Sequence, residues 1–343
     1  MQFVRHSVDI KFSPLCDMIK IYECASDLNF SKNINSVEIS EFFKKYINNL
    51  NCLGFKNKEC VSPKYVKCAD FYKFEENNKI MIMFSGGKDS TALAMKYRNL
   101  GFDVVLYFLQ GINISYRDEI DRAKEVASEL GLPLIIDTIK VLGHGEFLEN
   151  PTKNQLILSF AINKGLELGI YRYSYGGFTE DTVETSAFDR NFSDSIETFE
   201  WYKDCITAVF PQIEIITPFS NEIETLKIVG KHSKIWEMFQ SCLSPYRYKE
   251  YLKTTNERKY NIKLLKNRCG SCWKCCMEYI VWCDLGLVDY NKDFYKHCLD
   301  IFAKKMPEEK PYIQKTKNKK DIYLAYIPSK KLLNKSKFFK EKD

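Results

Sequence analysis

A phosphate-binding loop is the first feature of this chain that could do chemistry. The segment Met81–Met95 reads MIMFSGGKDSTALAM, an apolar strand that runs into Ser-Gly-Gly-Lys-Asp-Ser and then into a helix. The two glycines let the backbone turn tightly and bring its N–H groups to phosphate oxygens. The helix start adds further N–H groups and a positive dipole end, Lys88 adds a charge, and Asp89 offers oxygen to Mg²⁺. The predicted nucleotide-binding residues are Ser85, Gly86, Gly87, Lys88, Asp89, Ser90 and Thr91.

This loop is not a Walker A motif, which needs a glycine five residues ahead of Gly-Lys-Ser/Thr. Ile82 stands at that position, and Asp89 follows Lys88. The residues instead resemble the PP-loop of the ATP pyrophosphatases, which release pyrophosphate and leave AMP on an activated group. The alternative is an ordinary Gly-Gly turn between a strand and a helix.

A cluster of thiols near residue 270 predicts a metal site. Cys269, Cys272 and Cys275 are spaced by two residues, and Cys242 lies upstream. Four thiolates hold Zn²⁺ in a closed tetrahedral site, so these four cysteines are the predicted zinc ligands. An iron–sulfur cluster is the alternative, because it is also held by Cys thiolates. Cys276 and Cys283 are near enough to replace one of the four.

The elements around the loop alternate between strand and helix. Strands are expected at 80–84, 104–109, 134–139 and 213–216, and helices at 90–100, 117–130, 155–168, 224–239 and 293–303. This alternation predicts βαβ units and an α/β fold with a doubly wound parallel sheet. Ligands of such sheets bind at the carboxyl ends of the strands, where the loop lies.

The chain divides into three parts. Residues 1–76 are expected to form an accessory module with β-like pieces at 8–12 and 18–22. Residues 77–290 form the ATP pyrophosphatase domain with its cysteine region, and residues 291–343 a helix followed by a basic tail. We interpret the tail as a solvated end.

Composition sets further limits on function. The chain has 343 residues, of which 45% are hydrophobic and 14% aromatic, as in an ordinary globular protein. It contains no apolar run of the roughly 18–20 residues that span a membrane, and no secretory signal at its start. Thirteen scattered cysteines argue against a secreted disulfide scaffold. The net charge of +6 is mild and lies mainly in the tail. We therefore expect a cytoplasmic enzyme without a membrane or nucleic-acid partner.

With the loop and the cysteines in place, residues 79–290 resemble the 7-cyano-7-deazaguanine synthase (QueC) family. The segment Pro-Thr-Lys-Asn at 151–154 resembles the family's Pro-Gly-Arg-Asn, and Gly-Gly-Phe-Thr-Glu-Asp at 176–181 resembles the segment that leads to its conserved acid. The resemblance implies an ATP-dependent C–N ligase that uses ATP, Mg²⁺ and Zn²⁺. A 7-carboxy-7-deazaguanine carboxylate is adenylated, pyrophosphate leaves, and ammonia displaces AMP to give the amide. A second ATP then activates the amide, and loss of AMP leaves the nitrile. The implied catalytic residues are Lys88, Asp89, Lys153, Asp181 and Arg190.

Several positions depart from the family pattern. Lys153 and Glu278 each stand where the family has an Arg, and Leu243 stands where it has a Tyr. Arg190 matches only across a gap, and residues 1–76 and the tail have no counterpart. Extended relatives of this kind occur in bacterial antiviral defence operons. The resemblance therefore favours an enzyme that couples the deazaguanine to ammonia or to a protein amine, with residues 1–76 docking an acceptor or operon partner.

Two other functions stay open. One is an RNA-modifying PP-loop enzyme, a tRNA thiolase or lysidine-type ligase, in which the cysteines would carry sulfur. The other is a non-catalytic nucleotide-sensing subunit. The oligomeric state is also open, with a homodimer as one option.

Overall fold

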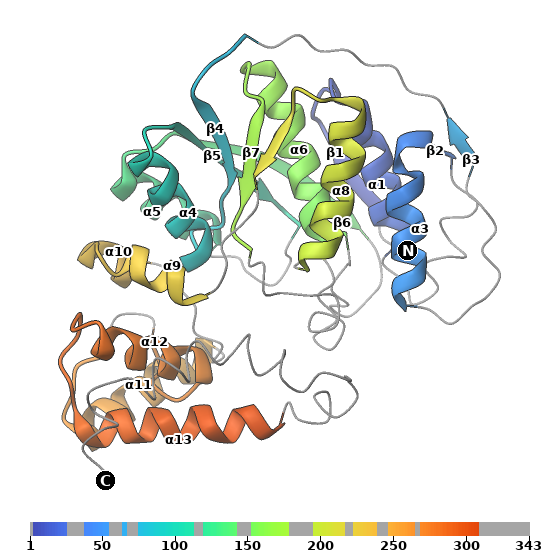
Figure 1. Cartoon of the computed structure of the whole chain (residues 1–343). Helices are drawn as coiled ribbons and strands as arrows, with labels where there is room; N and C mark the ends of the chain where they lie inside the picture. The colour runs from blue at the N-terminus through green and yellow to red at the C-terminus, as the bar shows by residue number, and fades with distance from the viewer. Residues whose placement is uncertain are drawn as a thin grey trace.

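A six-stranded sheet carries the phosphate loop (Figure 1). The computed structural model describes residues 3–25, 38–54, 64–66, 75–112, 119–142, 152–177, 195–216, 222–238, 246–264 and 268–308. Five strands of the sheet are parallel: β4 (Lys79–Met83), β5 (Asp103–Gln110), β6 (Leu134–Leu142), β7 (Arg172–Tyr175) and β8 (Glu214–Ile216). A sixth strand, β1 (Phe3–His6), pairs antiparallel with β6.

The strand order β1-β6-β5-β4-β7-β8 places the phosphate loop at the point where the topology reverses. The chain builds outward from β4 through β5 to β6, then returns to the other side of β4 with β7 and β8. The carboxyl ends of β4 and β7 therefore meet at a switch point, which is where open α/β sheets bind ligands.

Both faces of the sheet are covered, because the central strands are apolar on each side. Along β4, Ile80 and Ile82 pack in one core cluster with α4 (Lys88–Asn99) and α5 (Glu119–Leu130). Met81 and Met83 pack in the other with α6 (Lys153–Glu167), α8 (Ile196–Val209) and α1 (Ser13–Ala25). The predicted α/β fold with a parallel sheet is confirmed.

The N-terminal segment is tied to this sheet. β1 extends the sheet, and the Asn163 side chain of α6 accepts from the backbone N–H of Lys11 at 2.7 Å and of Phe12 at 2.9 Å. Beyond α1 lie β2 (Glu38–Ser40), η1 (Glu41–Phe43), α3 (Lys44–Gly54) and β3 (Lys64–Val66), with β2 and β3 pairing in a small sheet of their own. The boundary at residue 76 stays a prediction.

The expectation of β-like pieces in this segment was wrong. The strand lies at Phe3–His6 and not at 8–12, and residues 18–22 belong to α1. Leu15, Met18 and Tyr22 are all buried, a spacing of three and four residues that fits a helix face. Pro14 falls in the first turn of α1, where a helix tolerates proline.

The C-terminal part of the described chain is helical. α9 (Glu222–Val229) and α10 (Ser233–Met238) replace the single helix expected at 224–239, because the chain breaks at Gly230. α11 (Tyr246–Tyr260), α12 (Trp273–Asp284) and α13 (Lys292–Glu308) lie together beyond α9 and α10 (Figure 1). Within the residues that the structure describes, no helix has the length and apolarity to cross a membrane.

Candidate functional site

The loop between β4 and α4 is braced by its own hydroxyl groups. The Ser85 hydroxyl accepts from the Gly87 N–H at 3.2 Å, and the Ser90 hydroxyl accepts from the Ser85 N–H and donates to the Gly87 carbonyl, both at 3.3 Å. Gly87 is the N-cap of α4 and receives the first helical bond, from Thr91 N–H, at 3.0 Å. A glycine cap brings no side chain of its own to the helix start, so the start of α4 is left for an anion.

Two glycines let neighbouring elements approach the loop closely. Gly86 has φ +66°, and a Cβ there would lie 2.9 Å from the Ala123 Cα in α5. At the end of β7, a Cβ on Gly176 would lie 2.7 Å from the Ser90 backbone nitrogen and 2.8 Å from the Asp89 carbonyl carbon. The loop is therefore clamped between α5 and the end of β7.

The charged groups of the loop meet a hydroxyl from α9. Lys88 Nζ lies 2.6 Å from Asp89 Oδ1 and 3.3 Å from Thr225 Oγ1, and Thr225 Oγ1 lies 3.2 Å from Asp89 Oδ1. The Lys88 side chain is 3% exposed and the Asp89 side chain 33%, so the carboxylate faces outward and the ammonium does not. The sequence offered no signal for Thr225, which lies 136 residues from Asp89.

The other predicted catalytic residues are placed only in part. Lys153 is the first residue of α6 and is half-buried. Since α6 follows β6, its start lies at the same carboxyl edge of the sheet as the phosphate loop. Asp181 and Arg190 lie outside the described residues.

Three of the four predicted metal ligands are brought together. The Sγ atoms of Cys269, Cys272 and Cys275 all lie within 4.8 Å of one another, and those of Cys269 and Cys275 are 4.0 Å apart. The backbone N–H groups of Ser271 and Cys272 each donate to Cys269 Sγ at 3.3 Å, bonds that stabilise a thiolate. Cys272 caps α12, whose positive end also favours thiolates. Cys242 lies outside the described residues.

Two further cysteines considered as replacements are engaged elsewhere. The Cys276 thiol lies 3.7 Å from the Gly270 carbonyl, and the Cys283 thiol 3.9 Å from the Asp289 carbonyl. Burial raises the pKa of Cys283 to about 12, which favours the neutral thiol over a metal-binding thiolate.

The helices α11, α12 and α13 all contact the segment 268–275 that carries the clustered cysteines, which we call the thiolate loop. Asn256 of α11 donates to the Cys269 carbonyl at 2.8 Å, and His297 of α13 lies 3.2 Å from the Gly270 carbonyl through Nε2. Arg268, just before the first cysteine, pairs with Glu278 of α12 at 2.5 Å, with the two side chains 4% and 1% exposed. Glu278, which departs from the family pattern, therefore has a structural partner in this chain.

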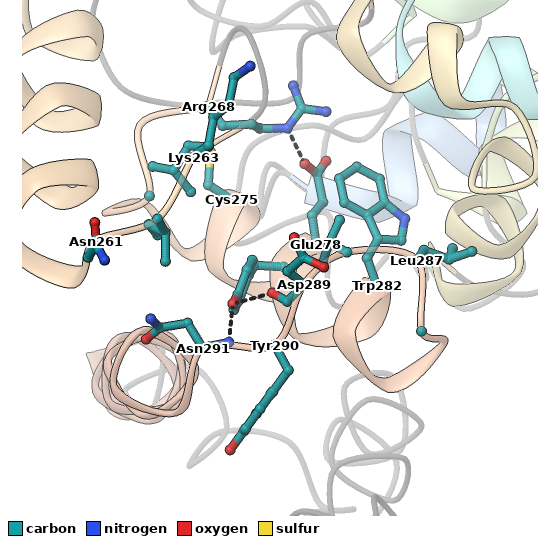
Figure 2. Close-up of a pocket in the computed structure, with 16 residues that line it drawn as sticks. Asn261, Lys263, Arg268, Cys275, Glu278, Trp282, Leu287, Asp289, Tyr290 and Asn291 are labelled. Carbon is teal, nitrogen blue, oxygen red and sulfur yellow. Dashed lines mark hydrogen bonds and ion pairs between the residues drawn. The ribbon is translucent and has the colours of Figure 1, made fainter.

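A cavity of about 600 Å³ adjoins this loop, between the end of α11 and the turn that follows α12. Figure 2 shows Arg268 and Glu278 pointing at each other on its wall, beside Trp282. The Tyr279 hydroxyl donates to the Asp289 carbonyl and accepts from the Asn291 N–H, both at 3.0 Å. Because these polar groups bind one another, the wall has the character of a structural support.

The chain resembles a curated protein. It is 7-cyano-7-deazaguanine synthase 1 of Desulfitobacterium hafniense (strain Y51), 23% identical over 165 residues, which span 42% of this chain and 71% of the relative. No protein-family model matches. The resemblance to 7-cyano-7-deazaguanine synthases that the phosphate loop and the cysteines suggested is confirmed, and the low identity makes the chain a divergent relative.

Solved structures that resemble the chain do so weakly. The U34-tRNA thiolase NcsA of Methanococcus maripaludis, with its 4Fe-4S cluster, gives a TM-score of 0.35 at 17% identity and covers 54% of this chain and 68% of its own. NMN synthetase of Francisella tularensis gives 0.33 at 10% identity, over 67% and 86%. A predicted tRNA methyltransferase subunit of Methanocaldococcus jannaschii gives 0.31 at 18% identity, over 53% and 87%. The fold assignment rests on the sheet of this chain itself.

Proposed function

We propose that this protein is an ATP-dependent ligase that adenylates the carboxylate of a 7-deazaguanine and couples it to an amine. The observation that carries the proposal is the clamped loop at 85–90, with Lys88 and Asp89 at the switch point of the sheet. The curated relative, a 7-cyano-7-deazaguanine synthase, supports the choice of substrate.

In this mechanism the loop binds and neutralises the phosphates. Backbone N–H groups at the start of α4 bind phosphate oxygens, and Lys88 moves from Asp89 to the charge that develops on the departing pyrophosphate. Asp89, the more exposed of the two, would hold Mg²⁺ through a carboxylate oxygen. These groups position the reactants, and no side-chain nucleophile is needed.

Two bond exchanges follow. A substrate carboxylate oxygen bonds to the α-phosphorus, and the bond from that phosphorus to the bridging oxygen breaks, which releases pyrophosphate. The amine then bonds to the acyl carbon and loses a proton, the bond from that carbon to the phosphorus-linked oxygen breaks, and AMP leaves with that oxygen. We assign Lys153, Asp181 and Arg190 to holding the substrate carboxylate and phosphates. This assignment is carried by the resemblance and by the place of Lys153 at the carboxyl edge.

We propose a single zinc ion at Cys269, Cys272 and Cys275, with Cys242 as the fourth ligand. Four thiolates at about 2.3 Å around one tetrahedral ion lie about 3.8 Å apart, close to the 4.0 Å between Cys269 and Cys275. Thiolates on separate irons of a cluster stand farther apart, so the spacing favours one ion over iron and sulfide. Its role would be to fix the loop that α11, α12 and α13 surround.

We also propose that the acceptor is ammonia or an amine of a partner protein encoded nearby, in a defence role. The departure at Lys153 and the added N-terminal segment support the second option, an acceptor that differs from the ammonia of the biosynthetic enzyme.

The decisive experiment follows the phosphates. ATP labelled at the α- or γ-phosphate is incubated with 7-carboxy-7-deazaguanine and with ammonia or the co-expressed neighbour protein. We expect AMP and pyrophosphate from the wild type and from the control Asp103→Asn, an exposed residue at the start of β5, and neither product from Asp89→Asn. ADP with orthophosphate, or no turnover with any amine, would refute the proposal. AMP and pyrophosphate formed only when tRNA is added, with or without the deazaguanine, would favour the RNA-modifying alternative.

A further inference from the structure

Thr225 of α9 contacts both charged residues of the phosphate loop, yet neither the sequence nor the relatives assign it a role. We infer that Thr225 is a positioning residue that orients the Asp89 carboxylate toward the divalent cation of a magnesium nucleotide. This inference rests on the proposed nucleotide site and goes beyond it by naming what sets its cation requirement.

The direction of each bond follows from the groups involved. An ammonium has no acceptor and an ionised carboxylate has no donor, so the Thr225 hydroxyl accepts from Lys88 at 3.3 Å and donates its one proton to Asp89 at 3.2 Å. Lys88 reaches the same Oδ1 atom at 2.6 Å. Both bonds fall on Oδ1, so Oδ2 is the oxygen that Asp89 turns toward a cation.

The hydroxyl is held rigidly in this place. Thr225 is fully buried, and its β-branched side chain has few rotamers in a helix. Its neighbour Glu224 pairs with Lys96 of α4 at 3.2 Å, and Leu226 and Val229 lie in the core cluster shared with α4. The backbone of α9 is therefore fixed against the helix that carries Asp89.

The hydrogen bond from Thr225 to Asp89 matters more once a nucleotide is bound. In the proposed function Lys88 moves toward the departing pyrophosphate, so a nucleotide draws the ammonium away from its 2.6 Å contact with Asp89 and weakens that contact. The Thr225 bond then remains to stop the carboxylate from turning. A hydrogen bond to a charged group is worth enough that its loss weakens binding by about tenfold or more.

The test separates the hydroxyl from the shape of the side chain. Thr225→Val keeps the branched shape and removes the hydroxyl, while Thr225→Ser keeps the hydroxyl. Thr207→Val is the control, because Thr207, a half-buried threonine of α8, donates to the Lys203 carbonyl of its own helix at 2.9 Å. Binding of α,β-methylene ATP, which resists cleavage at the reacting bond, is measured by calorimetry in full-length protein across a range of Mg²⁺ concentrations and in EDTA.

We expect the wild type, Thr225→Ser and Thr207→Val to share one Mg²⁺ half-saturation. Thr225→Val should need about tenfold more Mg²⁺ and should bind the nucleotide in EDTA like the wild type. If Thr225→Val does not fold, Thr225→Ala takes its place with the same expected shift. An unchanged Mg²⁺ dependence without the hydroxyl, or a Thr225→Ser protein as impaired as Thr225→Val, would overturn the role of Thr225 but leave the proposed function standing. A wild type that binds no magnesium nucleotide would overturn the proposed function as well.

Discussion

A single methyl group at Gly176 should disable the nucleotide site without unfolding the protein. The Cβ of Gly176→Ala would lie 2.7 Å from the Ser90 nitrogen and 2.8 Å from the Asp89 carbonyl carbon, where ordinary contact begins at 3.4 Å. The start of α4 must therefore retreat by about 0.7 Å, at a cost of about 1–3 kcal/mol of overpacking. Because reacting groups must be placed to within about an ångström, we expect the turnover number to fall by 10- to 100-fold.

The matched control is Gly101→Ala, after α4. Gly101 has φ +85° with nothing within 4 Å of an added Cβ, so alanine there is strained but touches nothing. It should cost about 1 kcal/mol of stability through backbone strain and leave nucleotide binding unchanged. Urea unfolding gives the stability of both variants, and calorimetry with α,β-methylene ATP gives their affinity. The clamp is contradicted by a Gly176→Ala protein that binds the nucleotide and turns over like the wild type, or by a Gly101→Ala protein that loses as much nucleotide affinity as Gly176→Ala.

Three further predictions concern the metal, the pH and the buried ion pair. Metal analysis should give about one zinc per wild-type chain, and Cys269→Ser should lose that zinc and melt at a lower temperature; a variant with full zinc content would contradict the ligand assignment. Burial raises the pKa of Cys24 and of Cys205 from 9.0 to about 11, so the folded protein keeps protons that the unfolded chain releases. The free energy of unfolding should be unaffected below pH 9 and fall between pH 9 and 11, on the order of 2 kcal/mol per thiol; urea titrations of wild type and Cys205→Ala measure it, and equal slopes would contradict the assignment. Glu278→Gln should cost about 3–5 kcal/mol by leaving Arg268 charged and buried, while Arg268→Met with Glu278→Leu should recover much of that loss in the same titrations; a single variant as stable as the wild type would refute this.

The parts of the fold that the sequence predicted have strong local patterns. The glycines and hydroxyls at 85–90 sit between an apolar strand and a helix, and the helix at Glu119–Leu130 shows one apolar face through Ala123, Val126 and Leu130. The strand β7 escaped prediction because its four residues, Arg-Tyr-Ser-Tyr, carry no apolar run. It becomes a central strand by pairing with β4 and β8, which short-range sequence patterns do not record.

The parts of the site that escaped prediction depend on contacts between distant residues. Arg268 and Glu278 are ten residues apart, yet the sequence marked Glu278 only as a departure, since nothing local shows which side chain an acid meets. Thr225 looks like any helical threonine until α9 packs on α4. The loop glycine at 86, by contrast, could be predicted from the sequence, because its φ of +66° is a conformation that favours glycine.

The helices α4, α9 and α12 share one core cluster that links the two candidate sites, and this affects how cysteine variants should be interpreted. α9 touches the phosphate loop through Thr225, while a Cβ on Gly230, just after α9, would lie 2.5 Å from a Leu287 methyl and 3.6 Å from the Trp282 ring nitrogen. Loss of a metal from the thiolate loop would loosen α12, and α12 is a support of α9. An inactive Cys269 variant is thus expected from both a structural zinc and a sulfur-carrying thiol. The Mg²⁺ dependence of nucleotide binding separates these two roles. If the cysteines hold a structural zinc, their removal should change the Mg²⁺ concentration that nucleotide binding requires. If a cysteine only carries sulfur, that concentration should stay the same.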